Sequence, residues 1–221
     1  MHYASLDQDA SVFNVKDAYE DGNADFHTIV AEMAEIPRDQ AKTINLGLFY
    51  GMGKAKLQAE LGVSKDKAEE LFSIYHERVP FVKSLTRSVS NRAQQRGQIR
   101  TLLGRLCRFH LWEPNTFGMH KALPFDQAVQ EHGPGIKRAY TYKALNKLIQ
   151  GSAADMTKKS MLELYKEGIV AHIQIHDELC LSIENDAQAK KIVEIMEQAV
   201  SLEVPNKVDY EHGKNWGSIN D

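Results

Sequence analysis

Apolar residues recur at helical spacing along most of the first half of the chain. This spacing predicts a helix over residues 11–34 and another from Arg38 to Tyr50, where only Gly47 interrupts the run and Gly51 closes it. Further helices are expected over residues 65–75, 81–95, 138–167 and 187–202. The first of these follows Ser64, a residue type that caps helix N-termini well.

The second half of the chain is expected to contain short strands. Residues 97–109 read as strands around a turn at Gly104, residues 169–183 are rich in β-forming residues, and a final strand is expected over residues 204–211. Prolines and glycines make residues 112–135 mostly loop. Helices first and a mixed region second predict an α+β fold.

The composition is that of an ordinary globular protein with a net charge of −3. Its two cysteines, Cys107 and Cys180, exclude a disulfide framework and a cysteine-rich zinc site. No apolar run approaches the roughly 20 residues of a membrane span, and the N-terminus does not resemble a secretory signal. We therefore expect a soluble intracellular protein with no membrane partner.

Charge is strongly segregated along the chain. Residues 1–40 hold nine acids and two bases, whereas residues 78–110 hold eight lysines and arginines and no acid. This segregation creates a local positive field despite the negative total. Within the basic region Arg92, Arg96 and Arg100 recur every four residues, which suits phosphate binding if they share a helix face. A solvated helix face accounts for the same row equally well.

A candidate nucleotide-binding stripe lies in the predicted helix that starts at Arg38. Arg38, Lys42, Leu46 and Tyr50 are spaced by four, so they form one slowly turning line on a helix. Two cations at a helix start can clamp a polyphosphate, and an apolar residue and a phenol follow on the same face. By spacing alone, an amphipathic helix with two solvated cations is the commoner explanation.

A candidate metal-binding turn lies within residues 169–183. Apolar residues flank the charged trio His176-Asp177-Glu178, and two antiparallel strands joined there would place both carboxylates at the tip of a hairpin. A carboxylate pair of this kind suits Mg²⁺. The alternative is one continuous strand with an exposed acid pair.

Taken in order, these segments resemble the DNA polymerase I family (family A), particularly its phage members. Arg38–Gly51 resembles the fingers motif R-x3-K-x6-[YF]-Y-G, and His176–Glu178 resembles the second catalytic motif of the palm. Between them, Asn146–Asp155 resembles the helix that contacts the primer–template minor groove, and Thr101–Arg105 a strand and turn that touch the DNA backbone. The ending, Val204–Trp216, is similar to the family's C-terminal strand.

The resemblance implies a role for each residue of the Arg38 stripe. Arg38 and Lys42 would bind the triphosphate of the incoming dNTP and help to neutralise the leaving pyrophosphate, and Lys42 would count as catalytic. Leu46 would contact the sugar and base, and Tyr50 would guard the template-base position.

The resemblance also implies DNA contacts. Asn146, Gln150 and His176 would follow the minor groove and the primer end, where the acceptors are nearly the same for every base pair. Arg100 and Arg105 would contact phosphates, which position DNA without reading its sequence.

The resemblance implies a magnesium-dependent nucleotidyltransferase. Asp177 would hold both catalytic Mg²⁺ ions with Glu178 in support, and the ions would activate the primer 3′-hydroxyl in a two-metal mechanism. Residues 1–95 would form the fingers, and residues 96–221 the palm.

Two features depart from the family pattern. The motif D-[YF]-S-Q-x-E-[LP]-R, which carries the other catalytic aspartate, is missing, because Met1 aligns just after it. We therefore expect a split polymerase, in which a separate N-terminal polypeptide supplies the thumb and the first aspartate. In addition, leucine stands at position 46, where the family usually has phenylalanine or tyrosine. A non-catalytic nucleic-acid-binding relic and a truncated polymerase fragment remain the alternatives.

Overall fold

The computed structural model describes residues 2–6, 27–28, 31–32, 36–49, 52–116 and 118–218. The chain divides into two compact units, Met1–Ile149 and Gln150–Asp221. The predicted division into fingers (residues 1–95) and palm (residues 96–221) concerns function, and it stays a prediction. The predicted helix over residues 11–34 lies largely outside the described residues, although His27–Thr28 and Ala31–Glu32 are helical.

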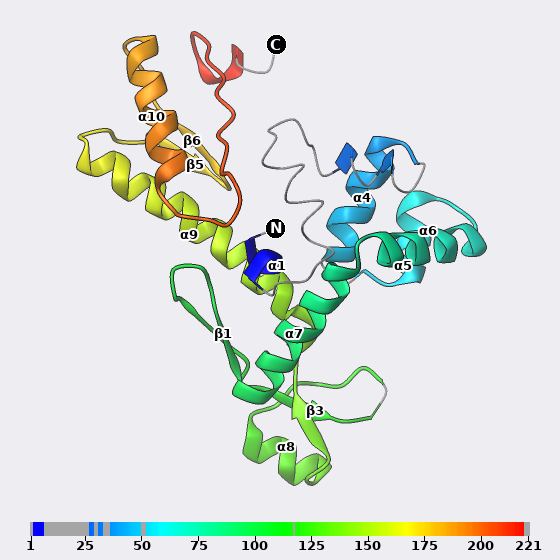
Figure 1. The fold of residues 1–221 in the computed structure, drawn as a ribbon. Coiled ribbons are helices and arrows are strands. Elements are labelled where there is room, and N and C mark those ends of the chain that lie inside the picture. The colour runs from blue at the N-terminus through cyan, green and yellow to red at the C-terminus, as the bar shows by residue number, and fades with distance from the viewer. Residues whose placement is uncertain are drawn as a thin grey trace. The chain divides into compact units, whose positions relative to one another are not determined.

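The first unit is built mainly from helices, as Figure 1 shows in blue to green. Its described helices are α1 (His2–Leu6), α4 (Arg38–Phe49), α5 (Lys54–Leu61), α6 (Lys65–Arg78), α7 (Pro80–Arg96) and α8 (Phe125–His132). The predicted helices over residues 38–50, 65–75 and 81–95 are confirmed wherever the structure describes them.

Local capping signals explain where α6 and α7 begin and end. The Ser64 hydroxyl accepts a hydrogen bond from the Lys67 amide at 3.2 Å, and Pro80 occupies the first turn of α7. Gly97 ends α7 in the left-handed region at φ 67°, where a Cβ atom would lie 2.7 Å from Cζ of Arg138. That guanidinium also donates to the carbonyls of Gln94 and Phe109. Glycine is therefore favoured at position 97 both by its positive φ and by the space that the Arg138 side chain occupies.

The hydrophobic core of the first unit gathers side chains from α4, α5, α6, α7 and the start of α9. The largest side chains with less than about 2% exposure in it are Tyr75, Phe81, Ile44, Leu57, Leu71 and Leu145. The Tyr75 hydroxyl is buried with them and has no hydrogen-bond partner among the described residues. Burial raises the pKa of this hydroxyl.

Replacing Tyr75 with phenylalanine is expected to leave the free energy of unfolding unchanged or to raise it by up to about 1 kcal/mol. The reason is that a buried hydroxyl without a partner contributes a desolvation cost and no compensating bond. Urea unfolding measures this, and Tyr75→Ala is the comparison, with an expected loss of about 3–5 kcal/mol for the cavity. A loss above 1 kcal/mol in Tyr75→Phe would contradict the expectation.

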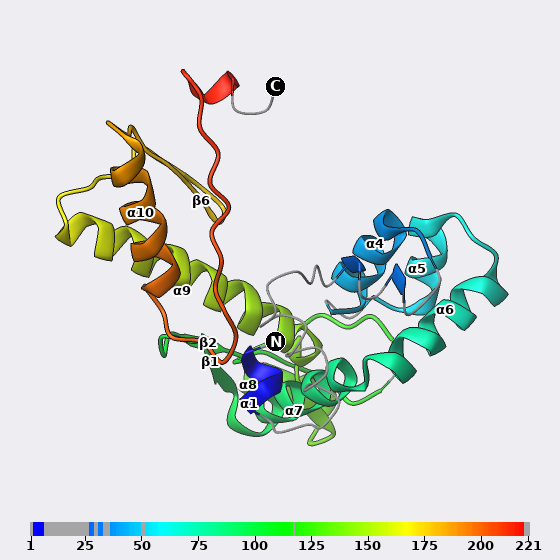
Figure 2. The same ribbon diagram turned by 45° about the horizontal axis from the view of Figure 1, so that its top comes forward.

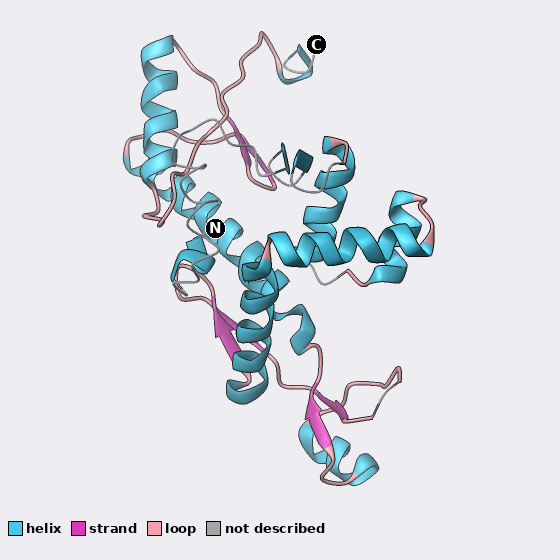
Figure 3. Cartoon of the chain, turned by 45° about the vertical axis from the view of Figure 1, so that its right-hand side comes forward, coloured by secondary structure: helices cyan, strands magenta, loops and turns pink. Residues whose placement is uncertain are grey.

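The described strands form three separate antiparallel pairs, drawn in magenta in Figure 3. In the first unit, β1 (Gln98–Arg100) pairs with β2 (Leu106–Arg108) around Gly104, whose φ is 86°, as the sequence predicts. The second pair joins β3 (Trp112–Pro114) to β4 (Ile136–Arg138).

The prediction that residues 112–135 are mostly loop misses two elements. These residues contain β3, and α8 lies between β3 and β4. Trp112 organises this small module, because its ring meets Phe125 edge-on at 5.1 Å and lies 4.5 Å from the Arg138 guanidinium. Its backbone also exchanges two hydrogen bonds with Leu123. These partners are far apart in sequence, so local composition does not reveal them.

The long helix α9 runs from Ala144 to Lys166, so the predicted start at residue 138 is wrong. Arg138 belongs to β4, and Tyr140 has a left-handed backbone at φ 61° that no α-helix continues through. The short 3₁₀ helix η2 (Thr141–Lys143) then leads into α9.

The second unit contains the rest of α9, the β5 (Ile173–Ile175) and β6 (Glu178–Cys180) pair, α10 (Asp186–Gln198) and η3 (Trp216–Ser218). The Asn185 side chain caps α10 by accepting from the Gln188 amide at 3.0 Å. Lys191 of α10 pairs with Glu167 at 2.7 Å. After α10 the chain runs as an extended segment to η3, drawn in red in Figure 2.

The predicted strand over residues 204–211 is wrong, because the structure assigns no strand to these residues. Strand formation requires a neighbouring strand that accepts the ladder hydrogen bonds. Here the Val208 amide donates instead to the Glu197 carboxylate at 3.0 Å. The extended segment, α9, β6 and α10 line a hollow of about 970 Å³ within this unit.

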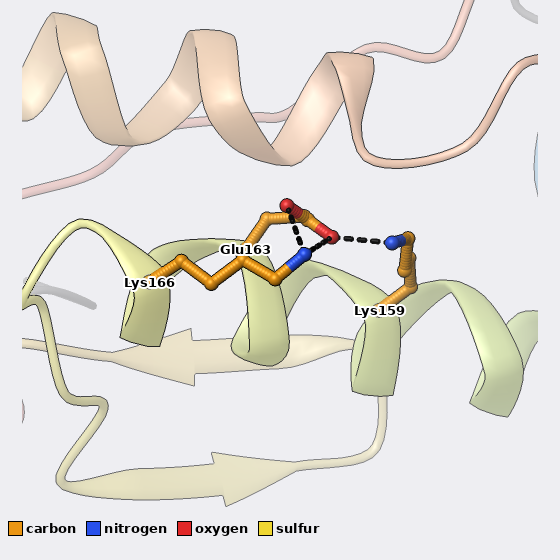
Figure 4. A network of polar contacts seen from close by, with 3 residues as sticks. All are labelled: Lys159, Glu163 and Lys166. Atoms are coloured by element: carbon orange, nitrogen blue, oxygen red, sulfur yellow. Dashed lines mark hydrogen bonds and ion pairs between the residues drawn. The ribbon is translucent and has the colours of Figure 1, made fainter.

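A charged network lies along α9. Lys159 and Lys166 both donate to the Glu163 carboxylate, as Figure 4 shows. These hydrogen bonds lower the pKa of Glu163 below its usual value. The network therefore stabilises the fold at neutral pH, and that contribution is lost as the pH falls through the lowered pKa.

Candidate functional site

The helix α4 presents the predicted nucleotide-binding residues on one exposed side. Arg38, Lys42 and Leu46 are all exposed, with Leu46 at 45%, whereas Ile44 and Leu48 on the other side are almost completely buried. The spacing of four therefore produces a real surface stripe, as the sequence predicts. Tyr50, the last member of the predicted stripe, lies outside the described residues.

Packing on the opposite side fixes the orientation of α4. The Asn45 side chain is 1% exposed, and its amide nitrogen lies 3.1 Å from Nδ1 of His27. Lys42 forms no ion pair with any residue that the structure describes, so its ammonium is available to an anion. The stripe thus combines a fixed backbone with an accessible positive charge near the helix start.

The predicted metal-binding turn is a tight hairpin. Ile175 pairs with Glu178, so His176 and Asp177 are its two turn residues, and the alternative of one continuous strand is wrong. His176 adopts φ 52°, a positive value of the kind that two-residue hairpin turns require. The side-chain Nε2 of Gln174 donates to the His176 carbonyl across the turn.

The hairpin exposes its carboxylates. Asp177 and Glu178 are both exposed at the turn, and the Cys180 thiol donates to Oε1 of Glu178 at 3.3 Å. Desolvation and this hydrogen bond raise the pKa of the Cys180 thiol. Two adjacent carboxylates offer the hard oxygen ligands that Mg²⁺ prefers.

The carboxylate pair is an incomplete metal centre by itself. Within the described parts of the chain, no group of three or more His, Cys, Asp or Glu side chains is arranged to hold a metal ion. Asp177 and Glu178 therefore offer two carboxylates, and waters or phosphate oxygens would fill the remaining positions around Mg²⁺.

The predicted DNA-contacting residues occupy two other places. Asn146 is half-buried and Gln150 is exposed, and both belong to α9. Arg100 and Arg105 are exposed on the β1–β2 hairpin, where the Arg100 guanidinium donates to the Gly104 carbonyl at 3.0 Å.

The basic row is exposed as well. Arg87, Arg92 and Arg96 lie on the outer side of α7, which packs against β1 and η2. None of these three makes an ion pair in the portion of the chain that the structure describes. The exposure of these arginines fits a phosphate-binding row and a solvated helix face alike, so both interpretations stay open.

The sequence interpretation missed the aromatic residues that precede α9. Tyr140 and Tyr142 are 40% and 63% exposed, and the Lys143 ammonium lies over both rings. The signal available in the sequence was two tyrosines next to a lysine within a basic stretch, a pattern too common to single out.

Comparisons with known proteins agree on one family. The sequence profile of DNA polymerase family A matches residues 4–218. A DNA-directed DNA polymerase of Pseudomonas phage M6 is 32% identical over 259 aligned residues, which cover 98% of this chain and 36% of that protein. DNA polymerase I of Bacillus caldotenax is 34% identical over 188 residues, which cover 81% of this chain and 20% of the relative.

A solved structure resembles the whole chain. It is the POL domain of Pol1 from M. smegmatis in complex with DNA primer-template and dNTP, with a TM-score of 0.76 and 26% sequence identity. The match covers 100% of this chain and 38% of that one.

The chain thus spans about a third of the phage relative and of this solved chain, and about a fifth of the bacillar relative. No helix in the described ranges is both long and apolar enough to cross a membrane. The likenesses in sequence and in structure extend over nearly all of the 221 residues. The chain belongs to DNA polymerase family A.

Proposed function

We propose that this chain carries the nucleotide-binding helix and a metal-binding hairpin of a DNA-templated DNA polymerase. Such an enzyme transfers a nucleotidyl group from a dNTP to a primer 3′-hydroxyl. The observation that carries the proposal is the two-residue turn that exposes Asp177 and Glu178. Adjacent carboxylates at a turn repel each other, and a cation bound between them attracts both.

In this proposal α4 binds the triphosphate. Arg38 lies at the helix start, where exposed backbone amides and the helix dipole also favour an anion, and Lys42 follows one turn later. Negative charge develops on the leaving pyrophosphate during transfer. The Lys42 ammonium stabilises that charge more than it stabilises the bound dNTP. Lys42 therefore lowers the energy of the transition state relative to the ground state.

In the same proposal Asp177 holds Mg²⁺ and Glu178 supports it. When bound, the ions supply Lewis-acid activation of the 3′-hydroxyl and stabilise the attacking and leaving oxygens. The hairpin's own contribution is position, because its two-residue turn places Asp177 beside Glu178 with both residues exposed.

We further propose that a separate N-terminal polypeptide supplies the thumb and the remaining catalytic aspartate. The proposal comes from the resemblance in sequence, because the motif that carries the family's other catalytic aspartate is not found among the 221 residues. The polymerases that the chain resembles are about three to five times longer.

DNA binding completes the proposal. Asn146, Gln150 and His176 contact the minor groove and the primer end, and Arg100 and Arg105 contact backbone phosphates. Exposed arginines on β1–β2 are suited to this because phosphate contacts need accessible cations and no base recognition. The enzyme then works in the cytoplasm of a bacterial or phage-infected cell.

The incomplete carboxylate pair also favours a second candidate function, a nucleic-acid-binding relic without catalysis. Single-nucleotide incorporation by an enzyme that contains this chain, measured against four templates that differ in one base, separates the two. A polymerase adds the complementary dNTP at each template. A relic binds primer–template and adds none.

Replacing Leu46 with phenylalanine is expected to speed dNTP insertion and to change discrimination against dideoxynucleotides. Leucine is 45% exposed on the α4 stripe and lacks the ring face that a sugar and base would pack against. Because the site is exposed, the melting temperature should not change. Equal insertion rates and equal dideoxynucleotide sensitivity in parent and variant would contradict this expectation.

A further inference from the structure

Helix α8, labelled in Figure 1, carries an open apolar stripe. Phe125 and Val129 lie one turn apart on it and are 51% and 37% exposed. The inner side of the helix is fixed, because Ala128 is fully buried and the Phe125 ring meets Trp112 edge-on. One side of α8 thus supports the module of β3, α8 and β4, and the neighbouring stripe stays open to solvent.

The loop before α8 lies against the last turn of this helix. The His120 ring centroid lies 6.5 Å from that of His132, and the Thr116 hydroxyl lies 3.2 Å from Nε2 of His120. Met119, the neighbour of His120, is fully exposed. Exposed methionine is common on surfaces that bind other proteins, because its flexible side chain adapts to the partner.

The large core of the first unit does not account for this stripe. Helix α8 packs on β3 and β4. The buried residues of the module include Leu123, Ala128 and Ala139, and all three lie outside the core cluster of the unit. The core therefore gives no reason for an apolar residue at the exposed position 129.

Helix α8 is acidic within a basic part of the chain. Residues 78–159 hold 15 lysines and arginines and four acids, and two of these acids, Asp126 and Glu131, are exposed on α8. Asp126 borders the stripe, about 60° around the helix axis from Val129. It forms no ion pair with any residue in the described ranges. Such a surface repels phosphate and attracts lysine and arginine.

We propose that this side of α8 is a docking surface for a basic amphipathic helix of a partner protein. The partner helix places apolar side chains, spaced by three or four residues, over Phe125 and Val129, and a lysine or arginine beside Asp126. A helix suits the stripe because side-chain ridges at a spacing of four pack into the grooves of another helix. The charge complementarity selects a basic segment and disfavours a nucleic acid.

This inference goes beyond the proposed function, because it assigns no step of nucleotidyl transfer to α8. The contact is small, so we expect weak and reversible binding. Substitutions on the stripe should leave primer extension unchanged. Failure of either proposal would therefore leave the other standing.

The test is the affinity of the full chain for two fluorescein-labelled helical peptides, measured by anisotropy. Both peptides carry leucines at a spacing of three and four, flanked in one by lysines and in the other by glutamates. The basic peptide should bind about tenfold or more tightly than the acidic one. Val129→Ser should weaken its binding about 3- to 20-fold. Leu162→Ser, which changes an exposed leucine of α9, is the matched control and should bind normally.

Reversing one charge tests the complementarity. Asp126→Lys should weaken binding of the basic peptide and strengthen binding of the acidic one, and both changes should shrink at high salt. Glu60→Lys, at an exposed position of α5, should change neither affinity. Both acids are exposed, so the melting temperature should stay the same in each variant.

Three results would overturn the proposal. The first is binding of the basic peptide that neither Val129→Ser nor Asp126→Lys reduces more than its control does. The second is displacement of that peptide by duplex DNA in a manner that depends on Val129, which would assign the surface to nucleic acid. The third is self-association in sedimentation velocity that Val129→Ser abolishes, which would make a second copy of the chain the occupant.

Discussion

Replacing Asp177 with alanine is expected to lower the rate of nucleotide incorporation about a thousandfold or more, in an enzyme that contains this chain and the remaining palm carboxylate. Metal ions supply several kcal/mol of transition-state stabilisation in reactions of this kind, and each 1.4 kcal/mol is a factor of about ten in rate. Asp177 is exposed at the hairpin turn and has no structural partner in the described residues, so its removal should not lower the melting temperature.

Two matched variants sharpen this prediction. Asp177→Asn keeps the size of the side chain and removes its charge, and it should be nearly as inactive as Asp177→Ala. Asp126→Asn changes an exposed aspartate of α8 and should leave the rate unchanged. Activity within tenfold of the parent in Asp177→Asn would show that Asp177 does not hold the metal.

Replacing Lys42 with alanine is expected to lower the incorporation rate about 100- to 1,000-fold. Removing one preorganised group that stabilises developing charge typically has an effect of this size. The loss should appear mainly in kcat, because the pyrophosphate gains charge in the transition state. Single-turnover kinetics over a range of dNTP concentrations separate kcat from KM.

The control for this prediction is Lys56→Ala, which removes an exposed lysine from the neighbouring helix α5. It should leave kcat and KM unchanged. Lys42→Arg should recover part of the rate, since it keeps the positive charge. A loss confined to KM would mean that Lys42 contributes only to binding of the dNTP, and the assigned role in pyrophosphate departure would be wrong.

Features set by neighbouring residues could be predicted from the sequence. The Ser64 cap, the proline at the start of α7 and the stripe on α4 follow from short-range rules about helix ends and helical spacing. The hairpin at Asp177 was one of two alternatives, because apolar residues on both sides of a charged trio fit a hairpin and a continuous strand equally.

Features set by distant partners could not be predicted. The module around Trp112 depends on Phe125 and Arg138, and its many glycines and prolines favour loop. Residues 204–211 have strand-forming residues and no strand beside them to complete the ladder. The position of Tyr140 in the left-handed region runs against the preference of tyrosine, so it is visible only in the structure.

The most direct test of the account is magnesium-dependent primer extension by this chain, first alone and then with a candidate N-terminal polypeptide added. The account predicts that the chain alone binds primer–template and adds no nucleotide, and that the added polypeptide restores template-directed extension that depends on Asp177. Extension by the chain alone would contradict the split-enzyme proposal. Absence of extension with a bound primer–template and the polypeptide present would contradict its role as a polymerase.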